Sequence, residues 1–433
     1  MIDIKLIREK PELVKENIKK KSQNGKLALV DKVLQLDDEW RKLKKRGDDL
    51  RAERNKISNE INQAKKKKDE KRAKELMSKA KKIPSEISEI ENKTGNLQKE
   101  INEIMMKIPN IMHKSVPVGK SEKENVELKK IGKARVPKYE IINHAELAEK
   151  LGIADFDSAR KTSGTGFYFL LGDLAILHSA ILAFARDFMI KQGFEYVIPP
   201  VMIRKNIVEG VMSFEERDAM MYKIQDEDLY LIGTSEHSMI GRFMDKTISG
   251  SKLPITLTSY SSCFRKEIGS HGIEEKGLYR RHQFEKQEMI VICEPDESYK
   301  WYDKMLRISV ELFRKLEIPV RILEMCSGDL ADLKAKGCDI EAWSPRQKRY
   351  FEVGSCSNLT DAQARRLNIK IDSKGKRYFA HTLNNTVIAS PRILIAILEN
   401  FQQKDGSVKI PKALWKYTCG KKVIGGKKGK KKK

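Results

Sequence analysis

The 433-residue sequence contains no apolar run that approaches the roughly 20 residues needed to span a bilayer. Its first ten residues, 1–10, mix polar and apolar side chains and lack the apolar stretch of a signal peptide. We therefore expect a soluble, cytoplasmic protein without a membrane partner. The sequence also lacks a Walker A motif and a GxGxxG that follows a strand. If the protein uses a nucleotide, side-chain cations and a metal ion must hold the phosphates.

Cysteine is scarce and scattered. No CxxC pair occurs, and no histidine stands at zinc-finger spacing. We therefore expect no zinc site and no disulfide framework, and most of the cysteines sit in apolar surroundings typical of reduced core residues. The six are Cys263, Cys293, Cys326, Cys338, Cys356 and Cys419.

Acidic residues are outnumbered. There are 86 Lys and Arg against 61 Asp and Glu, which gives a formal net charge of +25. Such an excess attracts polyanions, and nucleic acid is a better candidate than an anionic membrane surface. The apolar fraction of 40% predicts a folded chain, and the length suffices for two or three domains.

Two heptad repeats dominate the first quarter of the chain. They predict two helices that bury apolar stripes on each other, joined by a short polar run at 65–72, in an antiparallel coiled-coil hairpin over about 28–105. Pro84 should kink the second helix. Gly47 and Arg54 weaken a companion row of the first stripe. The main rows are Leu29, Leu36, Leu43, Leu50, Ile57 and Ala64, then Leu76, Ile83, Ile90, Leu97 and Ile104.

Basic residues crowd this hairpin. Residues 1–108 carry 30 Lys and Arg against 20 Asp and Glu, and the cations cluster at 41–46 and 65–74. A basic rod of this kind suits RNA phosphates. A dimerising coiled coil and an ordinary solvated helix face are the alternatives. We interpret 1–108 as an N-terminal RNA-binding domain.

The remainder divides into three parts. A proline-containing linker covers 109–140, and 141–417 forms one block in which helical patterns alternate with short strand-like runs. Because the spacing of βαβ units is absent, we predict an α+β fold with an antiparallel β-sheet core flanked by helices. Residues 418–433 form a tail whose last 14 residues hold eight lysines and no acid, and we expect it to be disordered. Extra RNA affinity, a nuclear address and simple solubility are its candidate roles.

One pair of segments has the residues for a nucleotide site. Phe264-Arg265-Lys266-Glu267 and the returning stretch 278–288 predict two strands joined by a loop. The guanidinium of Arg265 can donate hydrogen bonds to a carboxylate and a phosphate at once, and Arg281 can reach a polyphosphate. A purine can stack on the ring of Phe284. A surface hairpin with salt bridges is the plainer interpretation.

Two further segments complete the pattern. Ser390-Pro391-Arg392 opens an apolar helix, where an arginine and the helix N-terminus both favour phosphate. Gly193 ends a helix before a strand that stops at Pro199-Pro200. Each of these is common when taken alone.

In chain order, the segments at 193–200, 264–288 and 389–392 resemble motifs 1, 2 and 3 of class II aminoacyl-tRNA synthetases. The resemblance covers nearly the whole chain and is to the seryl-tRNA synthetase family, in its archaeal and eukaryotic form. It rests on the stretches Ile232-Gly233-Thr234-Ser235-Glu236-His237, Phe351-Glu352-Val353-Gly354-Ser355-Cys356-Ser357-Asn358 and His381-Thr382-Leu383-Asn384-Asn385-Thr386, on the linker 108–119 and on 264–272. Gly354 departs from the pattern, because a serine is common there, and we expect little loss.

The resemblance implies site residues. Arg265 and Arg392 would be catalytic, and Mg²⁺ would bind Glu352 and Ser355. The residues implied around L-serine are Thr234, Ser235, Glu236, Arg265, Glu288, Asn384 and Thr386. Those implied around ATP are Arg265, Lys266, Glu267, Arg281, Phe284, Glu352, Val353, Gly354, Ser355 and Arg392.

The resemblance also implies an activity. A member of this family activates L-serine with ATP as a substrate, forms seryl-adenylate and transfers serine to tRNA(Ser), held partly by the helical arm of a homodimer. Whether tRNA(Sec) is also charged stays open. The alternatives are a class II amino acid ligase that charges a carrier protein, and an inactive RNA-binding paralogue. The first typically lacks the helical arm, and the second would have lost Arg265 or Arg392, which are both present.

Overall fold

A computed structural model describes residues 1–267 and 277–425. The chain forms two compact units, one over Ile2–Pro109 and one that comprises Met1 and the residues from Asn110 onward. Among the helices described, none is long and apolar enough to cross a membrane.

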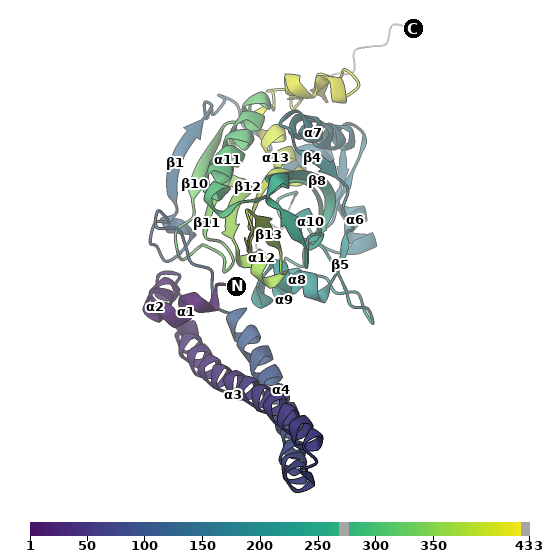
Figure 1. Cartoon of the computed structure of the whole chain (residues 1–433). Helices are drawn as coiled ribbons and strands as arrows, with labels where there is room; N and C mark the ends of the chain where they lie inside the picture. Colours follow the sequence, from purple (N-terminus) through teal and green to yellow (C-terminus); the bar gives the residue numbers. More distant parts are fainter. Residues whose placement is uncertain (268–276, 426–433) are drawn as a thin grey trace. The chain divides into compact units, whose positions relative to one another are not determined.

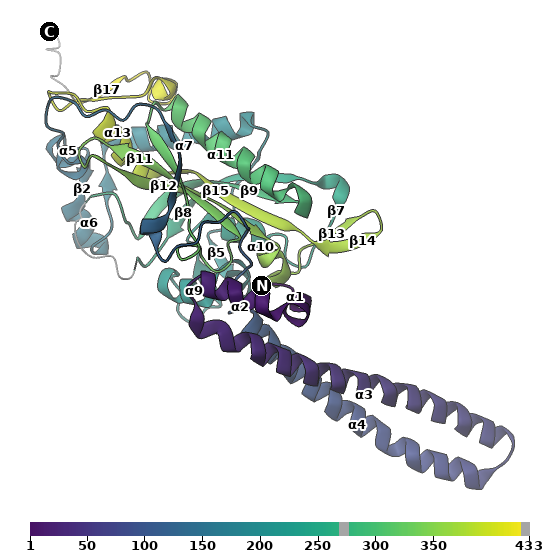
Figure 2. The same ribbon diagram turned by 90° about the vertical axis from the view of Figure 1, so that its left-hand side faces the viewer.

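The first unit is helical. Two short helices, α1 (Ile4–Glu9) and α2 (Pro11–Lys20), precede the long helices α3 (Leu27–Lys66) and α4 (Glu70–Met105). The long pair forms the expected hairpin (Figure 2). Its two heptad stripes meet in a cluster of buried side chains, which holds the pair together because exposed leucine and isoleucine would be costly. The cluster consists of Leu50, Ile57, Leu76, Ile83 and Ile87.

Gly47 was expected to weaken a companion row of the first apolar stripe, and the structure shows where it packs. It is buried, and a Cβ added to it would lie 3.3 Å from Cγ2 of Ile90 on α4. The glycine therefore lets the two helices approach closely at this level, rather than leaving a gap in the stripe. Arg54, in the same row, is exposed, and Pro84 lies inside α4.

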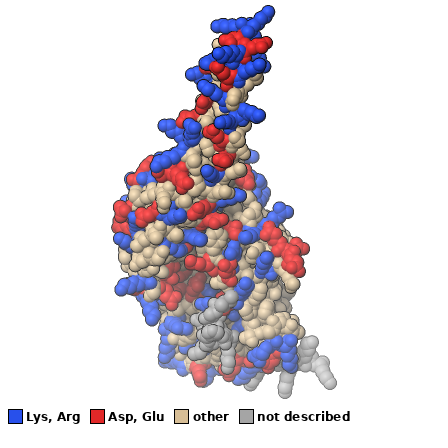
Figure 3. Space-filling model, turned by 90° about the horizontal axis from the view of Figure 1, so that it is seen from below, with Lys and Arg blue, Asp and Glu red and all other residues tan. Residues whose placement is uncertain are grey.

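The turn of the hairpin carries the densest positive charge. Residues 65–72 are all exposed, and Asp69 caps α4 by accepting a hydrogen bond from the backbone N of Arg72 at 3.0 Å. Lys and Arg side chains gather at this end of the arm, with a few Asp and Glu among them (Figure 3).

The second unit is built on an eight-stranded sheet in the order β1-β10-β11-β12-β15-β9-β8-β4. All neighbours are antiparallel except β4 and β8. The strands are β1 (Val126–Ile131), β4 (Glu195–Val197), β8 (Ile255–Phe264), β9 (Gln283–Cys293), β10 (Val320–Glu324), β11 (Lys336–Ser344), β12 (Arg349–Thr360) and β15 (His381–Ala389).

Helices cover the sheet, as the α+β prediction requires (Figure 1). They are α5 (His144–Lys150), α6 (Phe156–Ser163), α7 (Gly172–Lys191), α8 (Lys205–Val211), α9 (Phe214–Met220), α10 (Ser235–Gly241), α11 (Ser298–Lys315), α12 (Ala362–Arg366) and α13 (Ser390–Asn400). The smaller strands are β2 (Ala154–Asp155), β3 (Phe169–Leu170), β5 (Met202–Arg204), β6 (Leu229–Leu231), β7 (Thr247–Ser249), β13 (Lys370–Ser373), β14 (Lys376–Phe379), β16 (Val408–Lys409) and β17 (Val423–Ile424).

The side chains of β9 alternate between the two faces of the sheet, and both faces are buried. Met289 and Val291 pack with α7, α11 and α13 in one core cluster, whereas Ile290 and Ile292 pack with α10 and α12 in another. Successive side chains of a strand point to opposite faces, so an unbroken apolar run suits a strand with both faces covered. The site lies toward the N-terminal end of the same strand, where the side chains are polar.

Two segments differ from the sequence analysis. Residues 126–131, within the stretch assigned to a linker, form the edge strand β1 and pair with β10. In the tail, Val423–Ile424 form β17 and pair with β16. The lysine-rich end, from 426 onward, lies outside the described residues. The six cysteines are free, and all but Cys419 are buried, as expected.

Candidate active site

A cavity of about 1140 Å³ opens over the middle of the sheet. A smaller cavity of about 140 Å³ shares several of its walls, among them Arg265, Glu352 and Thr386. The walls come from β9, β11, β12 and β15, from the N-terminal end of α10 and from the residues that flank the ends of β8 and β9. Segments more than 100 residues apart in the sequence thus meet in one space.

One end of the large cavity is acidic. Thr234, which caps α10, donates a hydrogen bond from Oγ1 to Oε2 of Glu288 at 3.2 Å. Glu236 follows on α10, and its Oε1 accepts from Nε2 of Gln363 at 2.7 Å. Lys286 forms an ion pair with Glu288 on the same strand. The end therefore holds two carboxylates and one compensating ammonium group.

The protonation of Glu236 follows from this arrangement. Burial and the nearby carboxylate of Glu288 raise the pKa of Glu236 from 4.5 to about 7, although Gln363 and Lys286 partly oppose the rise. At pH 7 a carboxyl group with this pKa is close to half protonated when no cation is bound. A cation that enters the cavity favours its ionised form.

Strand pairing places β15 beside this acidic end. Thr386 lies directly opposite Glu288 in the register, and Asn384 opposite Ile290. Both line the cavity. A Cβ on Gly354, on the next strand, would lie 3.1 Å from Cβ of Thr386. The glycine therefore leaves room for the branched side chain of Thr386.

The other end is cationic. Arg265 follows β8, and its Nε donates to the carbonyl of Gly233 at 3.1 Å while its guanidinium lies 5.3 Å from the ring centre of Phe284. The backbone N of Arg265 donates to the carbonyl of His282 at 2.9 Å. The two strands around the loop are thus paired as predicted, with Arg265 opposite the returning strand.

Arg392 enters from the first turn of α13. Its Nη1 lies 2.8 Å from Oε2 of Glu352 and donates to the backbone carbonyl of Glu352 at 3.1 Å. Its guanidinium lies 4.6 Å from the ring centre of Tyr279. Burial tends to raise the pKa of Glu352, but Arg392 outweighs it and lowers that pKa. Glu352 is therefore ionised beside Arg392.

Most of the residues implied by the resemblance meet in these two cavities. Two do not. Ser235 is buried, its Oγ accepts from Oγ of Ser259 at 2.6 Å, and it lines neither cavity. Lys266 is also absent from both linings, and its backbone N donates to the carbonyl of Met220. Those present are Thr234, Glu236, Arg265, Glu267, Arg281, Phe284, Glu288, Glu352, Val353, Gly354, Ser355, Asn384, Thr386 and Arg392.

Three of the lining residues that were not predicted lie directly beside the predicted ones. Lys286 neutralises Glu288, Tyr279 stacks on Arg392, and Asp339 lies opposite Ser355 in the pairing of β11 with β12. Burial and the neighbouring Glu352 raise the pKa of Asp339. Lys286 could have been found from sequence, because it stands two residues before Glu288 and therefore on the same face of a strand.

Comparison with known proteins agrees with this geometry. A family model described as the tRNA synthetase class II core domain (G, H, P, S and T) matches residues 221–401, which include most of the residues that line the cavities. Fold and site together thus define the core of a class II tRNA synthetase. A second model, the seryl-tRNA synthetase N-terminal domain, matches residues 1–112. The chain is 45% identical to the serine–tRNA ligase of Pyrococcus furiosus over 446 residues, with 98% of each chain covered.

Solved structures give the same result. The seryl-tRNA synthetase of Pyrococcus horikoshii complexed with ATP superposes with a TM-score of 0.93 at 46% identity, covering 98% of this chain and 99% of that one. The cytoplasmic serine–tRNA ligase of Naegleria fowleri in complex with AMP has a TM-score of 0.88 at 32% identity, with 99% of each chain covered. The chain belongs to the seryl-tRNA synthetase family.

Proposed function

We propose that this protein activates L-serine with ATP and transfers the serine to the 3′ end of tRNA(Ser). The observation that carries the proposal is the polarity of two adjoining cavities: Glu236 and Glu288 line the larger one, Arg392 lines the smaller one, and Arg265 lies in the walls of both. Such a space suits a small molecule with an ammonium group that lies next to a polyphosphate. Membership of the family supports the same activity.

Serine would be held at the acidic end. Its ammonium group would meet Glu236 and Glu288, and its hydroxyl would meet the polar side chains of β9 and β15 near Thr386. A pocket that hydrogen-bonds a substrate hydroxyl rejects the analogue that lacks it, because buried polar groups are then left unpaired. Alanine should therefore be excluded by chemistry, and threonine by lack of space.

ATP would lie toward Arg265 and Arg392. In this geometry the adenine stacks near Phe284, and the serine carboxylate attacks the α-phosphorus in line, so that pyrophosphate leaves. The carboxylate is already ionised, and no general base is needed. Arg265 would contact both the carboxylate and the α-phosphate, so it lowers the barrier by positioning and by charge neutralisation. The terminal ribose hydroxyl of the tRNA then attacks the adenylate carbonyl, and the ester forms as AMP leaves and the hydroxyl proton is released.

The residues present fit Mg²⁺. Glu352 is ionised, its side chain is 41% exposed, and it lines the cavity together with the hydroxyl of Ser355. Oxygen donors of this type, few in number, suit a magnesium ion that takes its other ligands from phosphates and water. When bound, the ion would neutralise charge on the polyphosphate.

We assign the hairpin of α3 and α4 to tRNA binding. Its exposed lysines at 65–68 form a surface that phosphates can approach. We also propose a homodimer formed through motif 1. Ile190 and Ile198, near the end of α7 and after β4, are 48% and 76% exposed, which suits a covered interface. Whether tRNA(Sec) is charged as well is decided by an aminoacylation assay with both tRNAs.

Exchange of pyrophosphate into ATP, run with each of the twenty amino acids and without tRNA, tests the proposal. We expect exchange with serine alone. Exchange with a different amino acid would replace the proposed substrate, and no exchange with any of them would contradict the activity itself.

A further inference from the structure

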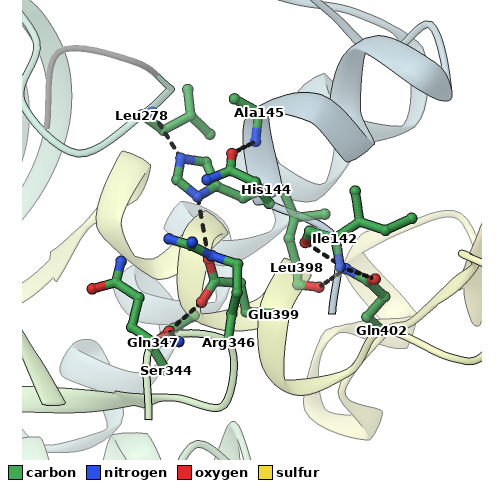
Figure 4. A network of polar contacts seen from close by, with 12 residues as sticks. Ile142, His144, Ala145, Leu278, Ser344, Arg346, Gln347, Leu398, Glu399 and Gln402 are labelled. Atoms are coloured by element: carbon green, nitrogen blue, oxygen red, sulfur yellow. Dashed lines mark hydrogen bonds and ion pairs between the residues drawn. The ribbon is translucent and has the colours of Figure 1, made fainter. Parts of the chain in front are cut away.

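His144 lines the large cavity and belongs to a buried network that is separate from the groups the proposed reaction uses (Figure 4). It begins α5, far in sequence from motifs 2 and 3, and its side chain is 5% exposed. Its two ring nitrogens face different partners. Nε2 lies 3.2 Å from the backbone N of Leu278, and Nδ1 lies 3.4 Å from Oε1 of Glu399.

These partners fix the tautomer of the ring. The amide of Leu278 is a donor, so Nε2 must be the unprotonated nitrogen, and Nδ1 then carries the hydrogen that faces Glu399. Glu399 is itself fixed, because Nε of Arg346 donates to its Oε1 at 3.0 Å and Oγ of Ser344 donates to its Oε2. Burial tends to raise the pKa of Glu399, but His144, Ser344 and Arg346 outweigh it and keep the carboxylate ionised.

The backbone that His144 contacts leads directly into the nucleotide site. Leu278 is fully buried, and Tyr279, Arg280 and Arg281 follow it in the walls of the two cavities. Gly277 has φ of +97°, and a Cβ on it would lie 2.2 Å from Nε2 of His144. A residue with a side chain would therefore displace the ring, so the glycine is what allows this contact.

Glu399 connects the network to motif 3. It stands in the last turn of α13, the helix whose first turn carries Arg392. Arg392 also donates from Nε to the carbonyl of Tyr279 at 3.4 Å, one residue after Leu278. Two adjacent residues of the motif 2 segment are thus hydrogen-bonded, Leu278 to His144 and Tyr279 to Arg392. Arg392 lies on α13, and His144 contacts Glu399 on the same helix.

We propose that His144 is a positioning residue for the nucleotide site. It fixes the backbone at Leu278. Tyr279 and Arg281 are thereby positioned, together with Arg392, to contact the polyphosphate. The inference rests on the proposed use of ATP. It assigns a function to α5, which lies outside the three motifs.

Two substitutions separate this role from a general structural one. His144→Gln places an amide oxygen near the position of Nε2 and can still accept from Leu278. His144→Asn places its amide near the position of Nδ1 and cannot reach Leu278. Ser344→Ala is the matched control, because it removes a hydrogen bond to the other oxygen of Glu399 and leaves the contact between His144 and Leu278 in place.

The first measurement is hydrogen–deuterium exchange of the full chain, read at the Leu278 amide in a peptide that begins at least three residues before Leu278. We expect His144→Asn to speed exchange of the Leu278 amide, and His144→Gln and Ser344→Ala to leave it slow. This measurement needs no turnover, so it stands even if the proposed activity fails. Equal protection in all variants, or equal loss in both His144 variants, would overturn the inference.

The second measurement is the KM for ATP in serine-dependent pyrophosphate exchange. We expect a rise of roughly tenfold for His144→Asn, because small displacements in a site reduce catalysis strongly. The KM for serine should stay within about twofold, and His144→Gln and Ser344→Ala should keep an ATP KM near that of the unsubstituted protein. Faster exchange at Leu278 with an unchanged ATP KM would also contradict the proposal. An unsubstituted protein without serine-dependent exchange would instead contradict the proposed function.

Discussion

Lowering the pH from 8 to 6 should raise the KM for serine about tenfold. Glu236 has a pKa of about 7, raised by burial and by Glu288, and we propose that its ionised form binds the ammonium group of serine. The ionised fraction of such a group is about ten elevenths at pH 8 and about one eleventh at pH 6. The ammonium group of free serine stays charged throughout this range, so Glu236 controls the change.

Serine-dependent pyrophosphate exchange at saturating ATP, measured at pH 6, 7 and 8, gives this KM directly. Glu236→Gln should have a high KM that no longer follows pH. Glu288→Gln should move the midpoint of the profile to lower pH, because one of the two causes of the raised pKa is gone. A flat profile in the unsubstituted protein, or an unchanged slope in Glu236→Gln, would refute the reasoning.

The same carboxylate should make the free protein less stable at high pH. Its folded-state pKa lies above the unfolded value of 4.5, so ionisation disfavours the folded state, and the penalty grows as the pH rises through about 7. The linkage gives about 2 kcal/mol at pH 6 and about 3 kcal/mol at pH 8. Glu236→Gln should therefore raise the melting temperature, by more at pH 8 than at pH 6. An equal gain at both pH values would contradict the assigned pKa.

Three further changes separate the parts of the molecule. Arg265→Ala should abolish pyrophosphate exchange, and Arg265→Lys should restore little of it, because an ammonium group cannot form the guanidinium fork; retained exchange in Arg265→Ala would contradict its role. Removing residues 25–105 should spare exchange and impair aminoacylation of tRNA, and equal loss of both would mean that the arm is needed for the catalytic fold. Gly47→Leu should destabilise the hairpin by about 1–3 kcal/mol, because the added side chain overpacks against Ile90. Thermal unfolding of the isolated arm, followed by circular dichroism, measures this loss. An arm of unchanged stability would show that the two helices can separate at this level.

The hairpin could be predicted from sequence because its contacts are local and periodic. Rows of apolar residues every seven positions indicate both the helices and the side that each buries. Gly47 was misjudged because a heptad count treats glycine as a missing side chain, whereas the structure uses the lack of a side chain for close approach. Strand β1 was missed for another reason. Five of its six residues are exposed, so an edge strand of this kind has no apolar alternation to detect.

The candidate site was predictable in its motifs and not in its orientations. Ser235 and Glu236 are adjacent on α10, yet only Glu236 lines the cavity, because the start of the helix turns Ser235 toward Ser259. Asp339 was missed because it lies in no motif and reaches the site only through the register of β11 with β12. Such pairings are set by contacts between distant segments, which a reading of one sequence does not contain.

The order of the sheet has a consequence for synthesis on the ribosome. The hairpin of α3 and α4 needs only a three-residue turn, so it can form as soon as those residues leave the exit tunnel. Strand β9, which carries Glu288, needs β15 as its neighbour, and β15 begins only at His381. Until then one edge of β9 presents backbone N–H and C=O groups that have no partner in the sheet, and a growing chain exposes it. The nascent protein should therefore present its helical arm well before its catalytic pocket exists, and chaperones that bind exposed strands should act in the interval between the two.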